Sequence, residues 1–254
     1  MPYKIKRYGW TRDLPDHRDH LYAAPKATLA ALPASVDLRG QCPPVYDQGQ
    51  LGSCTANAIA AAIQFDQMKQ KLSPVFNPSR LFIYYNERAI EGTVDSDSGA
   101  QIRDGIKSVA QQGDCPETEW PYDISKFAQK PPRPCYADAR KYKVVSYQRV
   151  TQSPDQMKGC LASGYPFVFG FTVYASFETP QVGKTGVLPM PQPGEQSVGG
   201  HAVLAVGYDD SRQSMIIRNS WGASWGQAGY FLMPYAYIMD PNLANDFWEV
   251  QVVL

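Results

Sequence analysis

The chain has 254 residues with no formal net charge at pH 7, and only 19% of its residues are charged. Such a chain lacks the basic field that binds nucleic acid or an anionic membrane surface, so we expect neither partner. No apolar run approaches the roughly 20 residues of a membrane helix, and we expect no ordinary signal peptide. The compartment stays open: cytoplasmic, or exported by another route.

Residues 1–31 differ in composition from the rest of the chain, because charges, prolines and aromatic residues alternate there without a helical or strand period. His17 and His20 flank Asp19, which could suggest a metal site, but a solvated polar segment is the simpler interpretation. With three histidines in all and no CxxC pair, we expect no metal and no cofactor.

The chemistry centres on residues 48–58, where a glycine-punctuated turn becomes an alanine-rich helix. Ser53 is a suitable N-cap, and Cys54 follows in the first turn. The helix dipole and unpaired N–H groups at that position favour a thiolate. A buried structural cysteine is the alternative for this stretch taken alone.

Two later stretches decide between these alternatives. Residues 198–208 form a glycine turn leading into an apolar strand, with His201 at its start, and Asn219 ends a predicted strand over 215–217. A thiol, an imidazole and a carboxamide match a nucleophile, a base and an orienting group. The imidazole takes the thiol proton, and the amide fixes the ring without adding charge.

These stretches resemble the active-site blocks of the papain-like cysteine peptidases. The block NSWGxxWGxxGYF is specific, Gln48 lies six residues before Cys54, and His201 lies 147 residues after it, inside the expected interval of about 130–150. The resemblance covers about residues 32–254. GSCTANA with a short N-terminal extension resembles a bacterial subgroup of the family.

The resemblance implies an α+β, two-lobed fold in which a helical lobe packs on a β-barrel-like lobe with the active-site cleft between them. It implies a peptidase domain over 32–254, with a helical lobe over about 40–140, a β-rich lobe over about 141–235 and a C-terminal strand over 236–254. Residues 1–31 then form a short prosegment. We hypothesise that this segment blocks the groove of a monomeric enzyme that acts on peptide or protein substrates.

The resemblance also implies roles for the four central residues. Cys54 attacks the scissile carbonyl, and His201 forms the thiolate–imidazolium pair and protonates the leaving amine. Asn219 orients His201, while Gln48 and the Cys54 N–H stabilise the oxyanion of an acyl-enzyme pathway. An acyltransferase or amidase using the same dyad, and an inactive peptide-binding homologue, remain the alternative functions.

Substrate contacts are implied at five further positions. Gly99 is the candidate for a backbone contact, with an ordinary loop glycine as the alternative. Gly199, Gly200 and Ala202 would line a small uncharged pocket for an apolar or aromatic side chain beside the cleaved residue. Trp221 would cover the histidine–asparagine bond or serve as a core residue. Thr55 departs from the family, which usually has an aromatic residue after the nucleophile.

The remaining pattern predicts a helix opening at 77–80, another over 100–112, and little regular structure over 114–145. Strands are predicted over 142–150, 165–174 and 246–253, a short helix over 156–163 and a loop over 180–200. The other four cysteines allow three pairings: Cys42, Cys115, Cys135 and Cys160. A disulfide between Cys115 and Cys135 would close the proline-rich connector.

Overall fold

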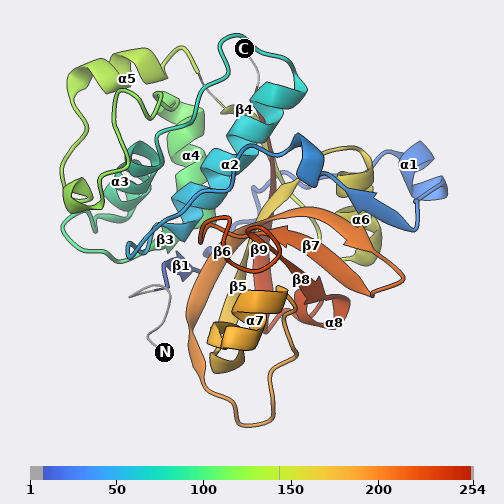
Figure 1. The fold of residues 1–254 in the computed structure, drawn as a ribbon. Helices are drawn as coiled ribbons and strands as arrows, with labels where there is room; N and C mark the ends of the chain where they lie inside the picture. The colour runs from blue at the N-terminus through green and yellow to red at the C-terminus, as the bar shows by residue number, and fades with distance from the viewer. Residues whose placement is uncertain (1–7, 143, 253–254) are drawn as a thin grey trace.

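The computed structural model describes residues 8–142 and 144–252. A group of helices packs against one side of a seven-stranded antiparallel sheet, and helix α2 runs between the two (Figure 1). The helical elements are α1 (Lys26–Ala30), α2 (Cys54–Lys69), α3 (Arg80–Glu91), α4 (Ile102–Gln112), α5 (Arg133–Ala139), α6 (Pro154–Ala162), α7 (Pro180–Thr185) and α8 (Tyr235–Ile238), with single 3₁₀ turns η1 (Arg39–Gln41), η2 (Ile124–Lys126) and η3 (Ala175–Glu178).

The strands of the large sheet run in the order β4-β9-β5-β6-β7-β8, with β2 paired to β6. Their bounds are β2 (Ser35–Asp37), β4 (Val144–Arg149), β5 (Phe167–Tyr174), β6 (Ser197–Asp209), β7 (Ser214–Arg218), β8 (Tyr230–Pro234) and β9 (Ala244–Val252). The C-terminal strand β9 lies between β4 and β5. Helices on one side of an antiparallel sheet give the predicted α+β class.

Helix α2 is buried on every side over residues 54–67. Its run of alanines lets it approach α3, α4 and strand β6 closely, so the helix crosses the middle of the molecule (Figure 1). Ser53 occupies the N-cap position, but its side chain caps no N–H of the helix. The hydroxyl instead meets the Tyr122 hydroxyl at 2.5 Å.

Helices α3 and α4 follow the predicted pattern with one difference. Ser79 caps α3 by accepting from the Phe82 N–H, and α3 ends at Gly92 in the left-handed conformation. The predicted helix over 100–112 begins only at Ile102, because Ala100 and Gln101 form strand β3 and pair with another strand, β1.

The proline-rich connector is more ordered than predicted. It contains η2 and helix α5, and Pro134 stands in the first turn of α5, where a missing N–H costs no hydrogen bond. The predicted loop over 180–200 likewise begins with α7, which starts at Pro180, and ends inside β6, which starts at Ser197. In both places proline starts a helix rather than interrupting one.

The N-terminal segment runs along the domain in an extended path. Strand β1 (Trp10–Thr11) pairs in parallel with β3, so this segment joins the helical side of the molecule. Farther along, the backbone N–H of Tyr22 donates to the backbone carbonyl of Arg149. Tyr22 and Ala24 belong to the main hydrophobic core. Residues 1–7 of the predicted prosegment lie outside the described residues.

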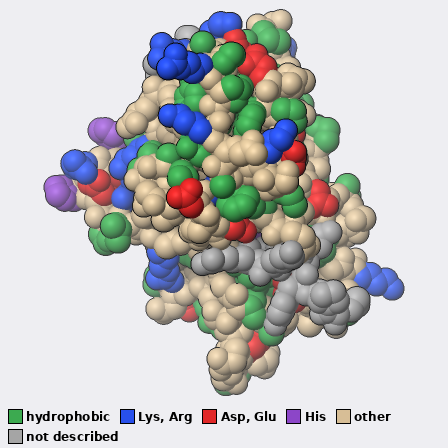
Figure 2. Space-filling model, turned by 90° about the vertical axis from the view of Figure 1, so that its left-hand side faces the viewer, with side chains coloured by type: hydrophobic (Ala, Val, Ile, Leu, Met, Phe, Trp, Pro, Cys, Tyr) green, Lys and Arg blue, Asp and Glu red, His purple; other side chains and the backbone are tan. Residues whose placement is uncertain are grey.

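The surface carries charges of both signs without a single-sign field on the face shown in Figure 2. Within residues 8–142 and 144–252, no helix is long and apolar enough to cross a membrane.

Candidate active site

Cys54 is the first residue of α2 and has no exposed surface. The backbone N–H groups of Ala202, Gly9 and Thr55 lie near its sulfur and act to lower the pKa of the thiol. The first comes from β6 and the second from the N-terminal segment. The sulfur therefore lies where α2, the sheet and the segment meet.

His201 and Asn219 form the second part of the site. The two residues stand on the neighbouring strand β6 and just after β7, and His201 Nε2 lies 2.8 Å from Asn219 Oδ1. The Ser220 N–H also donates to Asn219 Oδ1 at 2.8 Å, so this atom is the carbonyl oxygen of the amide. His201 Nε2 must then carry the proton, which leaves the lone pair on Nδ1, an atom without a hydrogen-bond partner among the described residues.

Trp221 covers the imidazole. Its indole stacks on His201 with ring centroids 5.1 Å apart and an angle of 29° between the planes, and it is almost fully buried. Phe171 meets the same ring edge-on at 5.8 Å. These apolar contacts keep water away from the bond between His201 and Asn219 and hold the ring in one orientation.

Gln48 reaches the site from the turn before α2. Its Oε1 accepts a 2.6 Å hydrogen bond from the Ser220 hydroxyl, and its Nε2 donates to the Leu51 carbonyl at 2.9 Å. The backbone N–H of Gln48 donates to the Ser220 carbonyl at 2.9 Å. Ser220 thus fixes both Gln48 and Asn219, and it ties the two lobes together beside the thiol.

Burial sets the charge state of the thiol and the imidazole. It raises the pKa of the Cys54 thiol to about 12 and lowers the pKa of His201 to about 4. Both groups are therefore neutral at pH 7 in this state. The thiolate expected at the helix start is not favoured here, because desolvation outweighs the backbone N–H groups directed at the sulfur.

The N-terminal segment lies directly on the site. The Tyr8 ring meets His201 edge-on at 5.8 Å and lies 6.4 Å from Trp221, and its hydroxyl donates to Glu178. The Gly9 carbonyl accepts from the Ala100 N–H at 2.7 Å. A methyl group built on Gly9 would stand 1.7 Å from the Gly52 carbonyl oxygen, so only glycine fits at this point of the path.

The structure places the predicted substrate-contact residues around this segment. A Cβ on Gly99 would meet the backbone of Gly9 at 2.1 Å, one on Gly199 would meet Tyr8 at 2.6 Å, and one on Gly200 would meet Trp10 at 2.5 Å. Ala202 is buried, and its backbone N–H lies near the Cys54 sulfur. Gly99, Gly199 and Gly200 therefore lie against residues 8–10, and Ala202 lies beside the nucleophile.

The rim loop over 92–99 is held in place by buried polar contacts. The Asp97 carboxylate accepts from the Gly52 N–H at 3.1 Å, next to the Cys54 turn. Arg88, on helix α3, donates to the backbone carbonyls of Val94 and Ser96. Gly99 itself has φ +73°, and its N–H donates to the Tyr84 hydroxyl at 3.2 Å.

Two residues at the site, Glu87 and Asp246, were not singled out from the sequence. Glu87 is fully buried behind Cys54, and its carboxylate accepts from Thr55. Asp246 lies under Trp10 and accepts from the indole N–H at 3.2 Å. In the sequence, each is marked only as a carboxylate within an otherwise apolar helix or strand. The fold is what brings both residues to the site.

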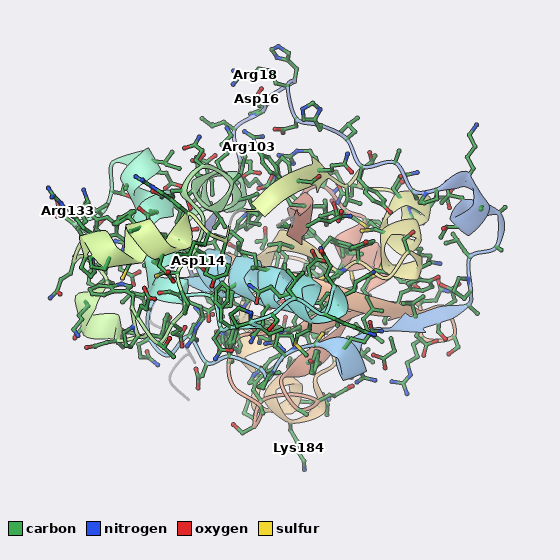
Figure 3. The ribbon with its side chains drawn as sticks, turned by 90° about the horizontal axis from the view of Figure 1, so that it is seen from above. Asp16, Arg18, Arg103, Asp114, Arg133 and Lys184 are labelled. Atoms are coloured by element: carbon green, nitrogen blue, oxygen red, sulfur yellow. The ribbon has the colours of Figure 1, made fainter. Side chains whose placement is uncertain are left out.

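The ion cluster beside the groove anchors the segment. Asp13 accepts from Arg149 at 3.0 Å and from the Trp248 indole at 2.8 Å, and Asp19 pairs with Arg103 at 2.7 Å. Figure 3 shows Arg103 beneath the outer loop that carries Asp16 and Arg18. In the described part of the chain, no group of three or more His, Cys, Asp or Glu residues is arranged to hold a metal ion.

The fold and the arrangement of thiol, imidazole and carboxamide define a class of cysteine proteases, and comparison with known proteins gives the same result. The family model "Papain family cysteine protease" matches residues 32–245. The chain belongs to the papain family and is a hydrolase of the cysteine protease class.

Three similar proteins match almost the whole chain. The crystal structure of xylellain, a cysteine protease from Xylella fastidiosa, shares 50% identity and a TM-score of 0.92, covering 100% of this chain and 99% of that chain. An uncharacterized peptidase C1-like protein of Acanthamoeba polyphaga mimivirus is 46% identical over 98% of this chain and 88% of its own length. Digestive procathepsin L 3 of Tenebrio molitor, at 19% identity and a TM-score of 0.73 (98% of this chain, 77% of that chain), shares the fold. The predicted resemblance to the papain-like family is confirmed.

Proposed function

We propose that this protein is a cysteine endopeptidase whose groove is closed by its own N-terminal segment. Residues 32–254 form the peptidase domain and residues 1–31 the inhibitory segment. The observation that carries the proposal is the position of Gly9. Its backbone N–H lies near the Cys54 sulfur, while the Tyr8 ring meets His201 edge-on and Trp10 lies against Gly200.

The catalytic steps follow from the contacts of each side chain. His201 Nδ1, which holds the lone pair, takes the thiol proton of Cys54, and the resulting thiolate attacks the peptide carbonyl. Asn219 holds the ring through Nε2 and stabilises the imidazolium. The Cys54 N–H and the amide of Gln48 stabilise the oxyanion, each donor contributing roughly 3–4 kcal/mol in other hydrolases.

In the closed state the substrate carbonyl has no access to the thiol, and burial opposes formation of the ion pair. Residues 8–10, which lie over the site, contribute to both effects. Removing their contacts opens the groove and hydrates the two catalytic groups. The segment is tethered to the domain, so its effective concentration at the groove is high.

Point variants test this proposal better than a deletion, because Tyr22 and Ala24 of the same segment belong to the core. Trp10→Ala removes a side chain that holds the segment in the groove. Leu14→Ala is the matched control, since the Leu14 side chain is 69% exposed. Hydrolysis of a peptide mixture and labelling of Cys54 by a thiol-directed epoxide are measured for the wild-type protein and both variants.

We expect Trp10→Ala to raise hydrolysis and labelling at least tenfold, with Leu14→Ala equal to the wild-type protein. Labelling without hydrolysis would favour a non-proteolytic homologue. Transfer of the acyl group to an added amine, in preference to water, would favour an acyltransferase. Equal rates in all three proteins would contradict closure by the segment.

A further inference from the structure

The peptide bond between Leu51 and Gly52, just before Cys54, is held by hydrogen bonds on both sides. Its N–H, from Gly52, donates to both carboxylate oxygens of Asp97 at 3.1 Å. Its carbonyl, from Leu51, accepts from Gln48 Nε2 at 2.9 Å. Leu51, Gly52 and Gln48 are buried, so water does not compete for either bond. One peptide unit therefore joins the Asp97 carboxylate to the side-chain amide of Gln48.

This connection strengthens the hold on Gln48. A carboxylate that accepts from a peptide N–H polarises the peptide, and the Leu51 carbonyl becomes a better acceptor for the Gln48 amide. On its other side, Gln48 Oε1 accepts from the Ser220 hydroxyl at 2.6 Å. The amide is thus fixed at its oxygen and at one N–H. Since an amide nitrogen carries two N–H groups, one remains to donate to an oxyanion.

Asp97 is in turn held by helix α3. The Tyr84 hydroxyl donates to Asp97 Oδ1 and accepts from the Gly99 N–H at 3.2 Å. Tyr84 itself is fully buried. One turn farther along α3, Arg88 donates to the carbonyl of Ser96, next to Asp97, at 2.9 Å. The position of the carboxylate is therefore set by a packed helix and not by the rim loop alone.

We propose that Asp97 is a positioning residue for catalysis, which holds Gln48 in place through the Leu51–Gly52 peptide. The inference rests on the proposed peptidase function and adds a residue to its machinery. A donor to the oxyanion acts in the transition state, so a misplaced Gln48 lowers kcat and leaves KM nearly unchanged. A carboxylate that only tied down the rim loop would change KM or stability and leave kcat as it is.

The first test uses the full chain with Trp10→Ala, in which the groove is open, and one fluorogenic peptide that this protein cleaves. We expect Asp97→Ala to lower kcat about tenfold with KM within about twofold, since a loosened oxyanion donor loses part of its effect. Asp97→Asn retains an acceptor for the Gly52 N–H and should recover most of kcat. Asp95→Ala, an exposed carboxylate on the same loop, is the matched control and should equal the background. A loss confined to KM, or no rescue by Asp97→Asn, would overturn the proposal.

A double-mutant cycle asks whether Asp97 acts through Gln48. In a Gln48→Ala background the amide that Asp97 positions is gone, so Asp97→Ala should change kcat by less than about twofold. A merely structural role for Asp97 would give the same fold loss with and without Gln48. Equal losses in the two backgrounds would therefore overturn the proposal.

Hydrogen exchange keeps the result independent of catalysis. The side-chain amide protons of Gln48 are followed by NMR in ¹⁵N-labelled full chain with the N-terminal segment unchanged. We expect exchange at least about fivefold faster in Asp97→Ala than in Asp95→Ala, because the bond to Leu51 weakens. If Asp97→Ala does not unfold cooperatively, Asp97→Ser, which is too short to reach Gly52, replaces it in every measurement. Equal exchange would overturn the proposal, whereas absence of hydrolysis with the exchange difference intact would count against the peptidase function alone.

Discussion

Thr55 donates a hydrogen bond of 2.6 Å to Glu87, and both side chains are fully buried behind the start of helix α2. Burial raises the pKa of Glu87 well above its usual range, and the hydrogen bond from Thr55 opposes this shift. Thr55 stands where the papain-like family usually has an aromatic residue. In this chain the residue after Cys54 links α2 to α3 through a polar contact.

The first prediction follows from that contact. Thr55→Val keeps the shape of the side chain and removes the hydroxyl, which leaves Glu87 without this donor. We expect a loss of about 1–3 kcal/mol in the free energy of unfolding, measured with urea. Thr55→Ser, which retains the hydroxyl, is the control and should lose less. Equal stability of Thr55→Val and the wild-type protein would show that the hydrogen bond contributes nothing net.

The second prediction concerns the catalytic groups in a Trp10→Ala background, where the groove is open. Cys54→Ala should reduce kcat/KM by at least about 10⁵-fold, because no other group can form the acyl-enzyme. Asn219→Ala should reduce it by roughly 100-fold, since the imidazole loses its orientation and keeps its chemistry. Circular dichroism controls for folding. Comparable losses in the two variants would contradict an orienting role for Asn219.

Sequence patterns predicted the elements that carry the site, because glycine punctuation and apolar runs around Cys54, His201 and Asn219 are local signals. Helix α5 was missed because proline was interpreted as a breaker, while Pro134 occupies a first turn where proline is tolerated. The contacts of Glu87 and Asp246 with residues 55 and 10 could not be predicted. They join segments far apart in the chain: α3 packs on α2 at Glu87, and the N-terminal segment packs on β9 at Asp246.

The third prediction concerns the pH dependence of Cys54 reactivity. Burial holds the thiol pKa at about 12 and the His201 pKa at about 4, and hydration of the open groove removes the main cause of both shifts. Alkylation of Cys54 by iodoacetamide, followed by site-specific mass spectrometry, should rise only at alkaline pH in the wild-type protein. In Trp10→Ala the profile should move down by roughly 2 or more pH units.

Leu14→Ala should keep the wild-type alkylation profile, since its side chain lies in solvent. Identical profiles for the wild-type protein and Trp10→Ala would mean that residues 8–10 do not set the ionisation of the thiol.

The fourth prediction concerns the pH dependence of stability at the segment anchor. Burial, together with the charge of Asp13, raises the pKa of Asp246 to about 6, and burial also raises the pKa of Asp13; Arg149 opposes both shifts. A carboxyl whose pKa is higher in the folded state contributes stability that is fully present below the unfolded pKa of about 3.9 and is lost as the pH rises through about 6. Acidification should therefore hold the segment more tightly.

The measurement is the free energy of unfolding at several pH values between about 4 and 7.5. The wild-type protein should lose roughly 1–3 kcal/mol more over this range than Asp246→Asn, which keeps an acceptor and does not titrate. The opposite slope, with stability rising toward pH 7.5 relative to Asp246→Asn, would contradict the assignment.

The last prediction concerns Cys115 and Cys135. The disulfide predicted between them is not formed in the structure, where both are free thiols that lie in one small apolar cluster with Phe82 and Ala139. Burial raises the pKa of both thiols, so oxidation by glutathione disulfide should be slow at pH 7 and faster at pH 9. Each bond formed releases two molecules of glutathione. It closes a loop of about twenty residues and should raise the free energy of unfolding by about 3 kcal/mol or less.

Cys135→Ser, which cannot form the bond, should show no difference in the free energy of unfolding between oxidising and reducing buffer. Peptide mapping of unreduced protein tests the pairing directly: a link from Cys115 to any cysteine other than Cys135, or two free thiols after prolonged oxidation at pH 9, would contradict it.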